Sequence, residues 1–519
     1  MATAAATATR LRASRAGDPT LAATALAGAA ACVILTITLA SGQVSGRGPA
    51  ALAAAAFLLV VIWCITHRRV DHTLVALALY LGLLDGYVKL RTGSSTVTLA
   101  RDALVIAIAA GALLRGAQTR QRILLPPLGG FVLAFSAVVL IELANPDARG
   151  FTASLAGVRQ HLEFVPLFFL GYAFVRTESQ IRKALLVLVF CAAVGGVVSY
   201  IQLTLTPTEL AGWGPGYRER VLGTGASTGG GRVGFEGANA TVRPFGLGSE
   251  IGSGAVAAAL ALPGLVALLM AADRRARWAI APMSVGIGLA VATSGSRAAL
   301  VTVFVSLAAF GLIAAASKNA LKAVAGIIVG VALIYAAVVQ LGPDNASTKR
   351  AQSIAPNKAL STFSTERGES VKAFVSLATD HPLGVGLGNV GPASGFQRAT
   401  VVKGLDAETE WNFLVIEAGV AAVSVYVAFL LRLVWLALTR IRRVADPALR
   451  LYLAALAAPI CSMLVAGFSG PTSAAPPFAP FLWLVSGVLA YWLVSGYRQG
   501  GLPRGNSPAP DPDLPARVR

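Results

Sequence analysis

Long apolar runs separated by short basic segments dominate the chain. A helix that crosses a hydrocarbon core of about 30 Å needs about 20 residues. Runs of about this length lie near residues 21–40, 49–66, 72–88, 98–114, 124–144, 162–175, 184–205, 250–272, 278–294, 298–316, 322–341, 411–437, 451–468 and 477–496. The pattern predicts an all-α polytopic membrane protein with about 12 to 14 spans, the range reflecting the short runs at 72–88 and 162–175.

Composition supports this fold class. Hydrophobic residues make up 55% of the 519 residues, charged residues only 13%, and the mean hydropathy is +0.69. These values lie outside the range of soluble globular domains. The net charge of +19 comes from small clusters between apolar runs, a pattern typical of membrane loops, so we expect a lipid bilayer and no nucleic acid as partner.

The basic clusters also predict which loops face the cytoplasm. With the N-terminus inside, the inner turns hold Arg68 and Arg69, three arginines at 115–122, three cations at 176–183, three arginines at 274–277, Lys318 and Lys322, and four arginines at 440–450. This charge pattern predicts that both termini are cytoplasmic. The predicted units are a tail at 1–20, helices at 21–205, an outer loop at 206–249, helices at 250–341, a large outer loop at 342–410, helices at 411–497 and a disordered tail at 498–519.

Several familiar chemistries are not indicated. The Gly-rich stretch at 223–237 lacks the Gly-Lys-Ser/Thr ending of a phosphate loop, and it favours a flexible segment. The four histidines are scattered, and the four cysteines lie singly inside apolar runs, so neither a metal site nor a disulfide framework is predicted. We expect no metal and no cofactor.

Two arginines on the predicted outer face are candidates for phosphate binding. Arg243 lies in "ATVRPFGLGSE" just before a span, and Arg297 lies in the turn "TSGSR" between two spans. A guanidinium stays charged at membrane depth and binds phosphate through two parallel N–H groups. The alternative is that each side chain simply extends to the membrane interface.

Carboxylates gather where the large outer loop meets the next span, in "GLDAETEWNFLVIEAGVAA" at 404–422. Glu410 and Glu417 are seven residues apart and share one helical face. A carboxylate inside a membrane is costly and indicates a functional site, unless it pairs with an arginine of a neighbouring span. Upstream, "DHPLGVGLGNVGP" at 380–392 predicts a tight loop whose glycines allow backbone to approach a ligand.

The order of these features resembles the O-antigen ligase and polymerase family of bacterial polysaccharide enzymes over roughly residues 230–440. The matching features are Arg-x-x-Gly before a span, "TSGSRAAL", a long outer loop with "HPLGVGLGN", and "WNFLVIEAGVAA" at the start of the next span. "LYLGLLDGYVKL" and "LAGVRQHLEFVPLFFLGY" are also similar to earlier spans of the family.

The resemblance implies an inverting, metal-independent glycosyltransferase of the GT-C class that takes a glycan from undecaprenyl pyrophosphate on the outer face. It implies that Arg243 and Arg297 contact the pyrophosphate and carry electrostatic catalysis. Ligases commonly have His-Asn where this chain has Trp411-Asn412. The general base therefore stays open, with Glu410, Glu408, Glu417 and His381 as candidates. Further expected substrate contacts are Arg218, Arg220, Arg159, Trp411, Asn412 and Glu417.

The expected partners are the lipid-linked donor, a glycan or lipid acceptor, a flippase and a chain-length regulator. Three other functions stay open. A transporter or flippase of lipid-linked sugars would also use arginines and buried carboxylates, although no internal repeat is seen. A glycosyltransferase of the shape, elongation, division and sporulation group fits the motif order less well. A non-catalytic component of an export complex would be compatible with Trp411 in place of histidine.

Overall fold

The computed structural model describes residues 47–67, 69–93, 96–118, 125–148, 150–222, 244–250, 252–293, 297–314, 325–326, 329, 356–391, 407 and 409–496. All regular elements in these ranges are helical, which confirms the predicted fold class.

Within the described residues, seven helical segments are long and apolar enough to cross a membrane. They are Val70–Thr92, Glu178–Thr204, Ser253–Ala271, Arg274–Thr293, Glu410–Arg443, Pro447–Ala466 and Phe478–Ser495. Shorter apolar helices cover Ala55–Thr66, Gly129–Ala144 and Ala298–Ala314. A helix is the economical form for these segments because each backbone N–H finds its acceptor within the same segment, with no help from water.

The helices used below have these bounds: α3 Arg47–Thr66, α5 Asp85–Thr92, α6 Thr96–Gln118, α7 Gly129–Ile141, α8 Phe151–Leu162, α9 Pro166–Phe174, α10 Glu178–Thr204, α11 Pro207–Ala211, α12 Pro215–Leu222, α13 Ser253–Ala271, α14 Arg274–Thr293, α15 Arg297–Ala314, α18 Pro356–Asp380, α19 Glu410–Arg440, α20 Pro447–Ala466 and α21 Phe478–Ala490. The polypeptide between Val70 and Thr92 is one helical run with a π-helical turn at Tyr80–Leu84.

Several predicted elements differ from the observed ones. The run at 162–175 forms only α9, whose 9 residues span about 14 Å at 1.5 Å per residue and cannot cross the bilayer. Hydropathy also missed α8, α11, α12 and α18, because short or half-polar helices do not produce a long apolar run. The expected span at 21–40 lies outside the described residues, as does nearly all of the one at 322–341.

Small residues let the helices pack closely. A Cβ atom on Gly196 of α10 would lie 1.8 Å from the carbonyl oxygen of Gly286 in α14, so the two backbones touch there. Helices α9 and α21 also touch through their backbones, because a Cβ atom on Gly171 would lie 2.2 Å from the carbonyl oxygen of Leu484 and one on Gly487 would lie 1.9 Å from that of Phe168. Association of membrane helices depends on such van der Waals packing, because lipid is as apolar as the helix surface. Helix α13 lies between α10, α14, α15 and α20 and is almost wholly buried.

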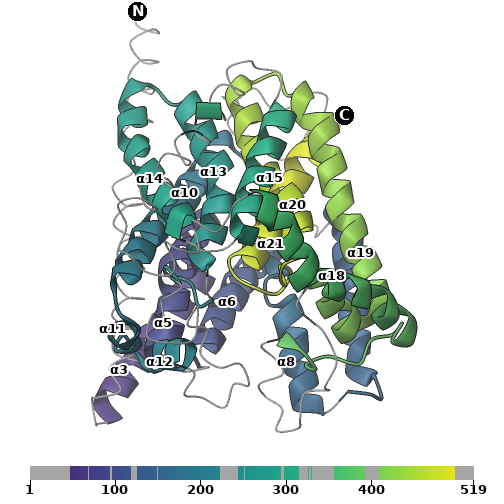
Figure 1. The fold of residues 1–519 in the computed structure, drawn as a ribbon. Coiled ribbons are helices and arrows are strands. Elements are labelled where there is room, and N and C mark those ends of the chain that lie inside the picture. The colour runs from purple at the N-terminus through teal and green to yellow at the C-terminus, as the bar shows by residue number, and fades with distance from the viewer. Residues whose placement is uncertain are drawn as a thin grey trace, which may run out of the picture.

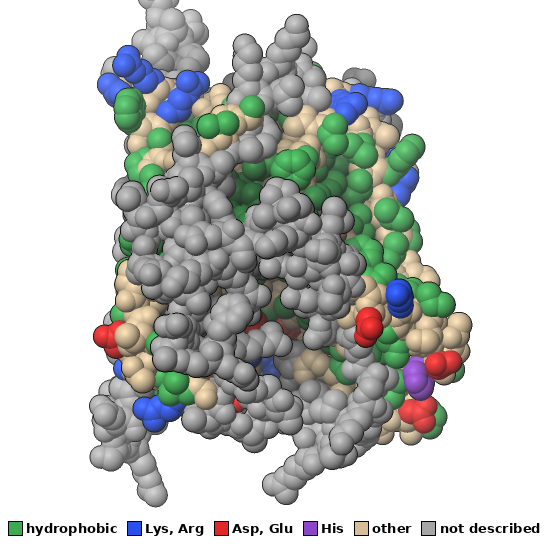
Figure 2. All heavy atoms as spheres, in the orientation of Figure 1, with side chains coloured by type: hydrophobic (Ala, Val, Ile, Leu, Met, Phe, Trp, Pro, Cys, Tyr) green, Lys and Arg blue, Asp and Glu red, His purple; other side chains and the backbone are tan. Residues whose placement is uncertain are grey.

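The two ends of the bundle differ in charge and in covering elements. Helices α8, α11, α12 and α18 gather at the lower end in Figure 1, where α19 also begins, whereas α14 begins at the upper end. The acidic side chains visible in Figure 2 lie in the lower half of that face, whereas Lys and Arg side chains gather at its upper corners and also occur in the lower half. Glu410, the first residue of α19, therefore lies toward the lower end of the bundle.

Candidate functional site

Helix α19 begins with a buried carboxylate. The Thr409 side chain caps the helix by accepting a hydrogen bond from the backbone N–H of Asn412 at 3.1 Å. Glu410 follows, with none of its surface exposed. Its backbone N–H donates to the carbonyl oxygen of Gly467 at 2.7 Å, which ties the start of α19 to the segment between α20 and α21.

The two carboxylate oxygens of Glu410 have different environments. Oε2 accepts hydrogen bonds from the backbone N–H groups of Thr472 and of Ser473, the latter at 3.1 Å. Oε1 is buried and has no hydrogen-bond partner among the described residues. Two amides thus hold this carboxylate through a single oxygen, and the other oxygen keeps its accepting capacity.

Glu417 lies two helical turns further along α19 and is fully buried. Both of its side-chain oxygens accept hydrogen bonds. Oε2 accepts from the backbone N–H of Gly388 at 2.7 Å, and Oε1 accepts from that of Val390 at 2.8 Å. Glu417 therefore anchors the Gly-rich loop at 384–391. The pairing with an arginine of a neighbouring span, weighed as an alternative, is not what the described residues show.

The backbone of the same segment forms hydrogen bonds with α19 at the point where that helix is broken. Ala418 and Gly419 have non-helical backbone angles, with φ of +71° at Gly419. The break frees the carbonyl oxygen of Ile416, which accepts from the N–H of Val385 at 2.7 Å, while Val420 donates to the carbonyl oxygen of Pro382 at 2.9 Å. A Cβ atom at position 419 would lie 2.6 Å from that Pro382 oxygen, so glycine is needed there. The kink thus has a specific cause, the insertion of the loop backbone.

Trp411 and Asn412, which follow Glu410, contact neighbouring segments of the bundle. The amide nitrogen of Asn412 donates to the carbonyl oxygen of Ser370 at 2.8 Å, which attaches α18 to α19. Trp411 packs edge-on against Phe468, with ring centroids 5.7 Å apart.

His381 lies just past the end of α18 and is partly exposed, and its carbonyl oxygen accepts a hydrogen bond from the backbone N–H of Gly384. In the described residues no polar contact links His381 to Glu410.

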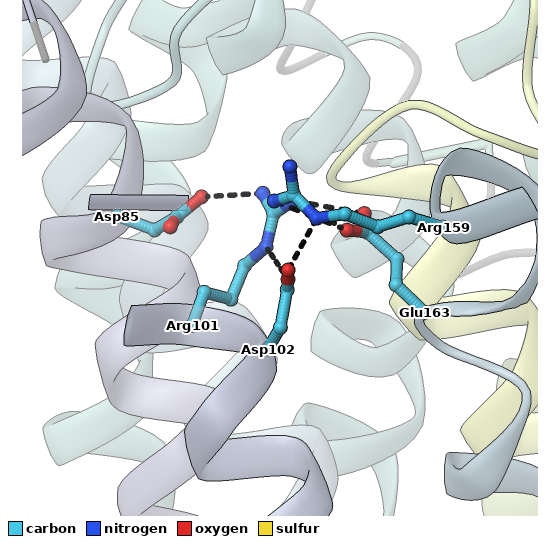
Figure 3. A network of polar contacts seen from close by, with 5 residues as sticks. All are labelled: Asp85, Arg101, Asp102, Arg159 and Glu163. Atoms are coloured by element: carbon cyan, nitrogen blue, oxygen red, sulfur yellow. Dashed lines mark hydrogen bonds and ion pairs between the residues drawn. The ribbon is translucent and has the colours of Figure 1, made fainter. Parts of the chain in front are cut away.

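A network of five charged side chains joins α5, α6 and α8 (Figure 3). Arg101 of α6 donates to both oxygens of Glu163 at 2.8 Å and to Asp85 at 3.1 Å. Arg159 of α8 bonds Asp102 and lies 3.8 Å from Glu163. Arg101 is 7% exposed and Arg159 is 27% exposed, so Arg159 is the member within reach of a ligand.

Three carboxylates and two guanidiniums give this network a formal charge of −1 when all are ionised. Glu163 lies in the turn between α8 and α9, outside the candidate spans. Burial raises the pKa of Glu163 to about 7, and the opposing effect of Arg101 is smaller. Protonation of this carboxyl near neutral pH would make the network neutral.

The segment that follows Arg243 is held from α10. Gln202 accepts from the backbone N–H groups of Phe245 at 2.8 Å and Gly246 at 2.9 Å, and its amide nitrogen donates to the carbonyl oxygen of Gly246 at 2.9 Å. In the cap formed by α11 and α12, Arg220 makes a two-pronged ion pair with Glu250 at 2.9 and 3.2 Å. Arg218 is exposed on the same helix.

The predicted site residues are thus only partly brought together. Glu410, Trp411 and Asn412 form one cluster with Glu417 on the same helix, and Arg159 lies on α8, which packs on the loop that Glu417 holds. Arg243 and Glu408 lie outside the described residues, and of Arg297 only its place at the start of α15 is described.

Sequence reasoning missed Asp85, Arg101, Asp102, His161 and Glu163. A usable signal existed in "VRQHLEF", where Arg159 and Glu163 are four residues apart on one helical face, and in the Arg101-Asp102 pair inside an apolar run. Among the described residues, no group of three or more His, Cys, Asp or Glu side chains could hold a metal ion.

Fold and site together define a multi-pass membrane protein with buried carboxylates and arginines at one end of its bundle. Residues 282–412 match the family model described as O-Antigen ligase. This match, which runs from α14 to Asn412 in α19, supports assignment to the O-antigen ligase and polymerase family, and hence a membrane glycan ligase or polymerase. No curated protein and no solved structure matched the chain.

Proposed function

We propose that the protein transfers or polymerises a glycan from an undecaprenyl-pyrophosphate-linked donor on the outer face of the plasma membrane. The observation that carries this proposal is Glu410, whose Oε2 is fixed by two backbone amides while Oε1 lacks a partner among the described residues. A held carboxylate with one free accepting oxygen suits a general base for an acceptor hydroxyl.

The arginines would act on the donor. Arg159 is held by Asp102 and Glu163 and is partly exposed, so a phosphate oxygen could bind it without first ordering its side chain. Arg243 and Arg297 are proposed to contact the pyrophosphate as well, with Arg218 and Arg220 as further donor contacts. Such cations stabilise the charge that develops as the pyrophosphate leaves.

Chemistry follows from these roles. The base removes the proton of the acceptor hydroxyl, the hydroxyl oxygen attacks the anomeric carbon from the side opposite the pyrophosphate, and the leaving group departs with the bonding electrons. A single displacement of this kind inverts the anomeric configuration, and arginines supply the charge stabilisation that a metal ion would otherwise give. The proposal is therefore an inverting, metal-independent glycosyltransferase with a GT-C-like plan.

Charge supports the proposed orientation. Arg274, Arg275 and Arg277 begin α14, and Arg440, Arg442 and Arg443 end the α19 segment, where Arg442 donates to the carbonyl oxygen of Leu312 at 2.6 Å. These clusters lie at the end opposite Glu410, and clustered arginines favour the cytoplasm. Glu410 would then face outward, with both termini inside.

Glycan transfer in proteoliposomes that contain undecaprenyl-pyrophosphate-linked oligosaccharide tests the proposal. Wild type should give a product ladder if it is a polymerase, or a single shifted product if it is a ligase. Arg297→Ala should abolish transfer, and Glu410→Gln should lower kcat by about 10²- to 10⁴-fold. Glutamine keeps the one oxygen that both amides need, so the fold should survive.

Arg277→Ala is the matched control, because Arg277 lies at the opposite end and donates only to the carbonyl oxygen of Ala272 among its described partners. It should transfer glycan at the wild-type rate. A wild type that transfers nothing, with verified donor and several acceptors present, would refute the enzyme and favour a transporter or a non-catalytic role.

A further inference from the structure

The guanidinium of Arg159 on α8 is held at one nitrogen. Its Nε donates a hydrogen bond to Oδ2 of Asp102 on α6. Its Nη2 lies 3.8 Å from Oε2 of Glu163, which is an ion pair but too long for a hydrogen bond. Among the described residues, Nη1 and Nη2 make no hydrogen bond, and the side chain is partly exposed. The terminal edge of this guanidinium is therefore open to a ligand.

The carboxylate of Asp102 has a fixed cation on its other side. Its Oδ1 lies 3.6 Å from Nε of Arg101. Arg101 donates to both oxygens of Glu163 at 2.8 Å and to Asp85 at 3.1 Å, and it is nearly buried, so it is not free to turn away. Figure 3 shows Asp102 between the two guanidiniums. The position of Asp102, and with it that of Arg159, is set by the buried part of the network.

We propose that Asp102 is a positioning residue that directs the Nη1 and Nη2 atoms of Arg159 toward one phosphate group of the donor. The inference rests on the proposed function, in which Arg159 contacts the pyrophosphate. A guanidinium held at Nε keeps its two terminal nitrogens, which can donate in parallel to two oxygens of one phosphate. Asp102 acts through Arg159 and does not itself touch the donor.

The neighbouring carboxylate of Glu163 provides a comparison. Both of its oxygens accept hydrogen bonds from Arg101, and it makes no hydrogen bond to Arg159. Loss of either carboxylate changes the charge of the network by the same one unit. Only loss of Asp102 would release the Arg159 side chain. Substitutions at the two positions therefore separate positioning of Arg159 from the effect of net charge.

Inorganic pyrophosphate is the probe for binding. Its Kd is measured by isothermal titration calorimetry on the full-length protein in micelles. Asp102→Ala should raise this Kd by about 10-fold, because binding must then order a long side chain. Asp102→Asn keeps an oxygen that can accept from Nε of Arg159, so its Kd should stay within about 3-fold of wild type. Glu163→Gln removes a negative charge but no hydrogen bond to Arg159, so its Kd should not rise.

A double-mutant cycle tests whether Asp102 acts through Arg159. In an Arg159→Ala background, Asp102→Ala should cause no further rise in the Kd for pyrophosphate, because the side chain that it positions is gone. A further rise of about 10-fold in that background would overturn the inference. Arg277→Ala, at the opposite end of the bundle, is the control and should bind pyrophosphate as the wild type does.

Transfer kinetics supply a second measurement. Asp102→Ala should raise the KM for the lipid-linked donor by about 10-fold and leave kcat within about 3-fold, since the cost of ordering Arg159 is met when the donor binds. A purely structural aspartate would lower the amount of folded protein and leave the KM of the folded fraction unchanged. Asp102→Leu is the second variant if alanine prevents folding, and the same rise in Kd and KM is expected.

The outcomes separate the two proposals. A wild type that binds pyrophosphate but transfers no glycan would refute the proposed function alone, and the Kd series would still decide the role of Asp102. Three results would overturn that role: no binding of pyrophosphate by the wild type, an unchanged Kd in Asp102→Ala, or equal shifts of Kd in Asp102→Ala and Glu163→Gln.

Discussion

The same substitution at two buried glutamates of one helix should have opposite effects. In Glu410 a single oxygen accepts both amide hydrogen bonds, so glutamine can keep both with its carbonyl oxygen. In Glu417 each oxygen accepts one amide, from Gly388 and from Val390. Glutamine at 417 can keep one of them, and its NH₂ group must face the other N–H.

The magnitude follows from that geometry. Glu417→Gln leaves one buried N–H without an acceptor, at a cost of about 1–3 kcal/mol, and replaces a charged acceptor by a neutral one at the other, for a total of about 3 kcal/mol. Each 1.4 kcal/mol is about a factor of ten, so opening of the loop should become about 100-fold more frequent. Glu410→Gln should leave loop opening unchanged.

Hydrogen–deuterium exchange of the peptide covering residues 384–391, followed by mass spectrometry in nanodiscs, measures this directly. We expect about 100-fold faster exchange of that peptide in Glu417→Gln and wild-type exchange in Glu410→Gln. Glycan transfer should not follow loop exchange, because Glu410→Gln should lose transfer activity although its loop exchanges as in the wild type. Equal exchange of the peptide in both variants would refute the assignment of Glu417 as the anchor of the loop.

Three further predictions concern the framework. Arg101→Ala should lower the free energy of unfolding by about 3–5 kcal/mol, because its buried carboxylate partners lose their cation. Thermal unfolding in micelles measures this, and the exposed Arg220→Ala should lower the same free energy by less than about 1 kcal/mol. Similar losses in the two variants would contradict the reasoning. Gly196→Ala should yield little folded protein by size-exclusion chromatography, since its Cβ would lie 1.8 Å from a backbone oxygen, whereas Gly195→Ala meets nothing within 4 Å and should fold. Gln202→Leu removes three hydrogen bonds to residues 245–246 and should speed exchange of the 244–250 peptide and reduce transfer, with exchange of 410–420 unchanged as the internal control.

Hydropathy was enough to predict an all-α polytopic fold, because a long apolar helix is a local property of the chain. The family resemblance likewise depended on short motifs in order, and the match of residues 282–412 supports it. Elements without a long apolar run were not predictable in this way. Helix α8 has only 12 residues and carries Arg159 and His161, yet it packs against the loop that Glu417 holds.

The sequence by itself determined that Glu410 and Glu417 lie on one helix at the boundary of a span, since helical periodicity places residues seven apart on one face. Only the tertiary structure decided what each carboxylate does. The amides that bind Glu410 come from residues 472–473, more than 60 positions away, and the imidazole beside Glu417 comes from α8, more than 250 positions away. Partners so distant in the chain are set by helix packing, which no local pattern of residues encodes.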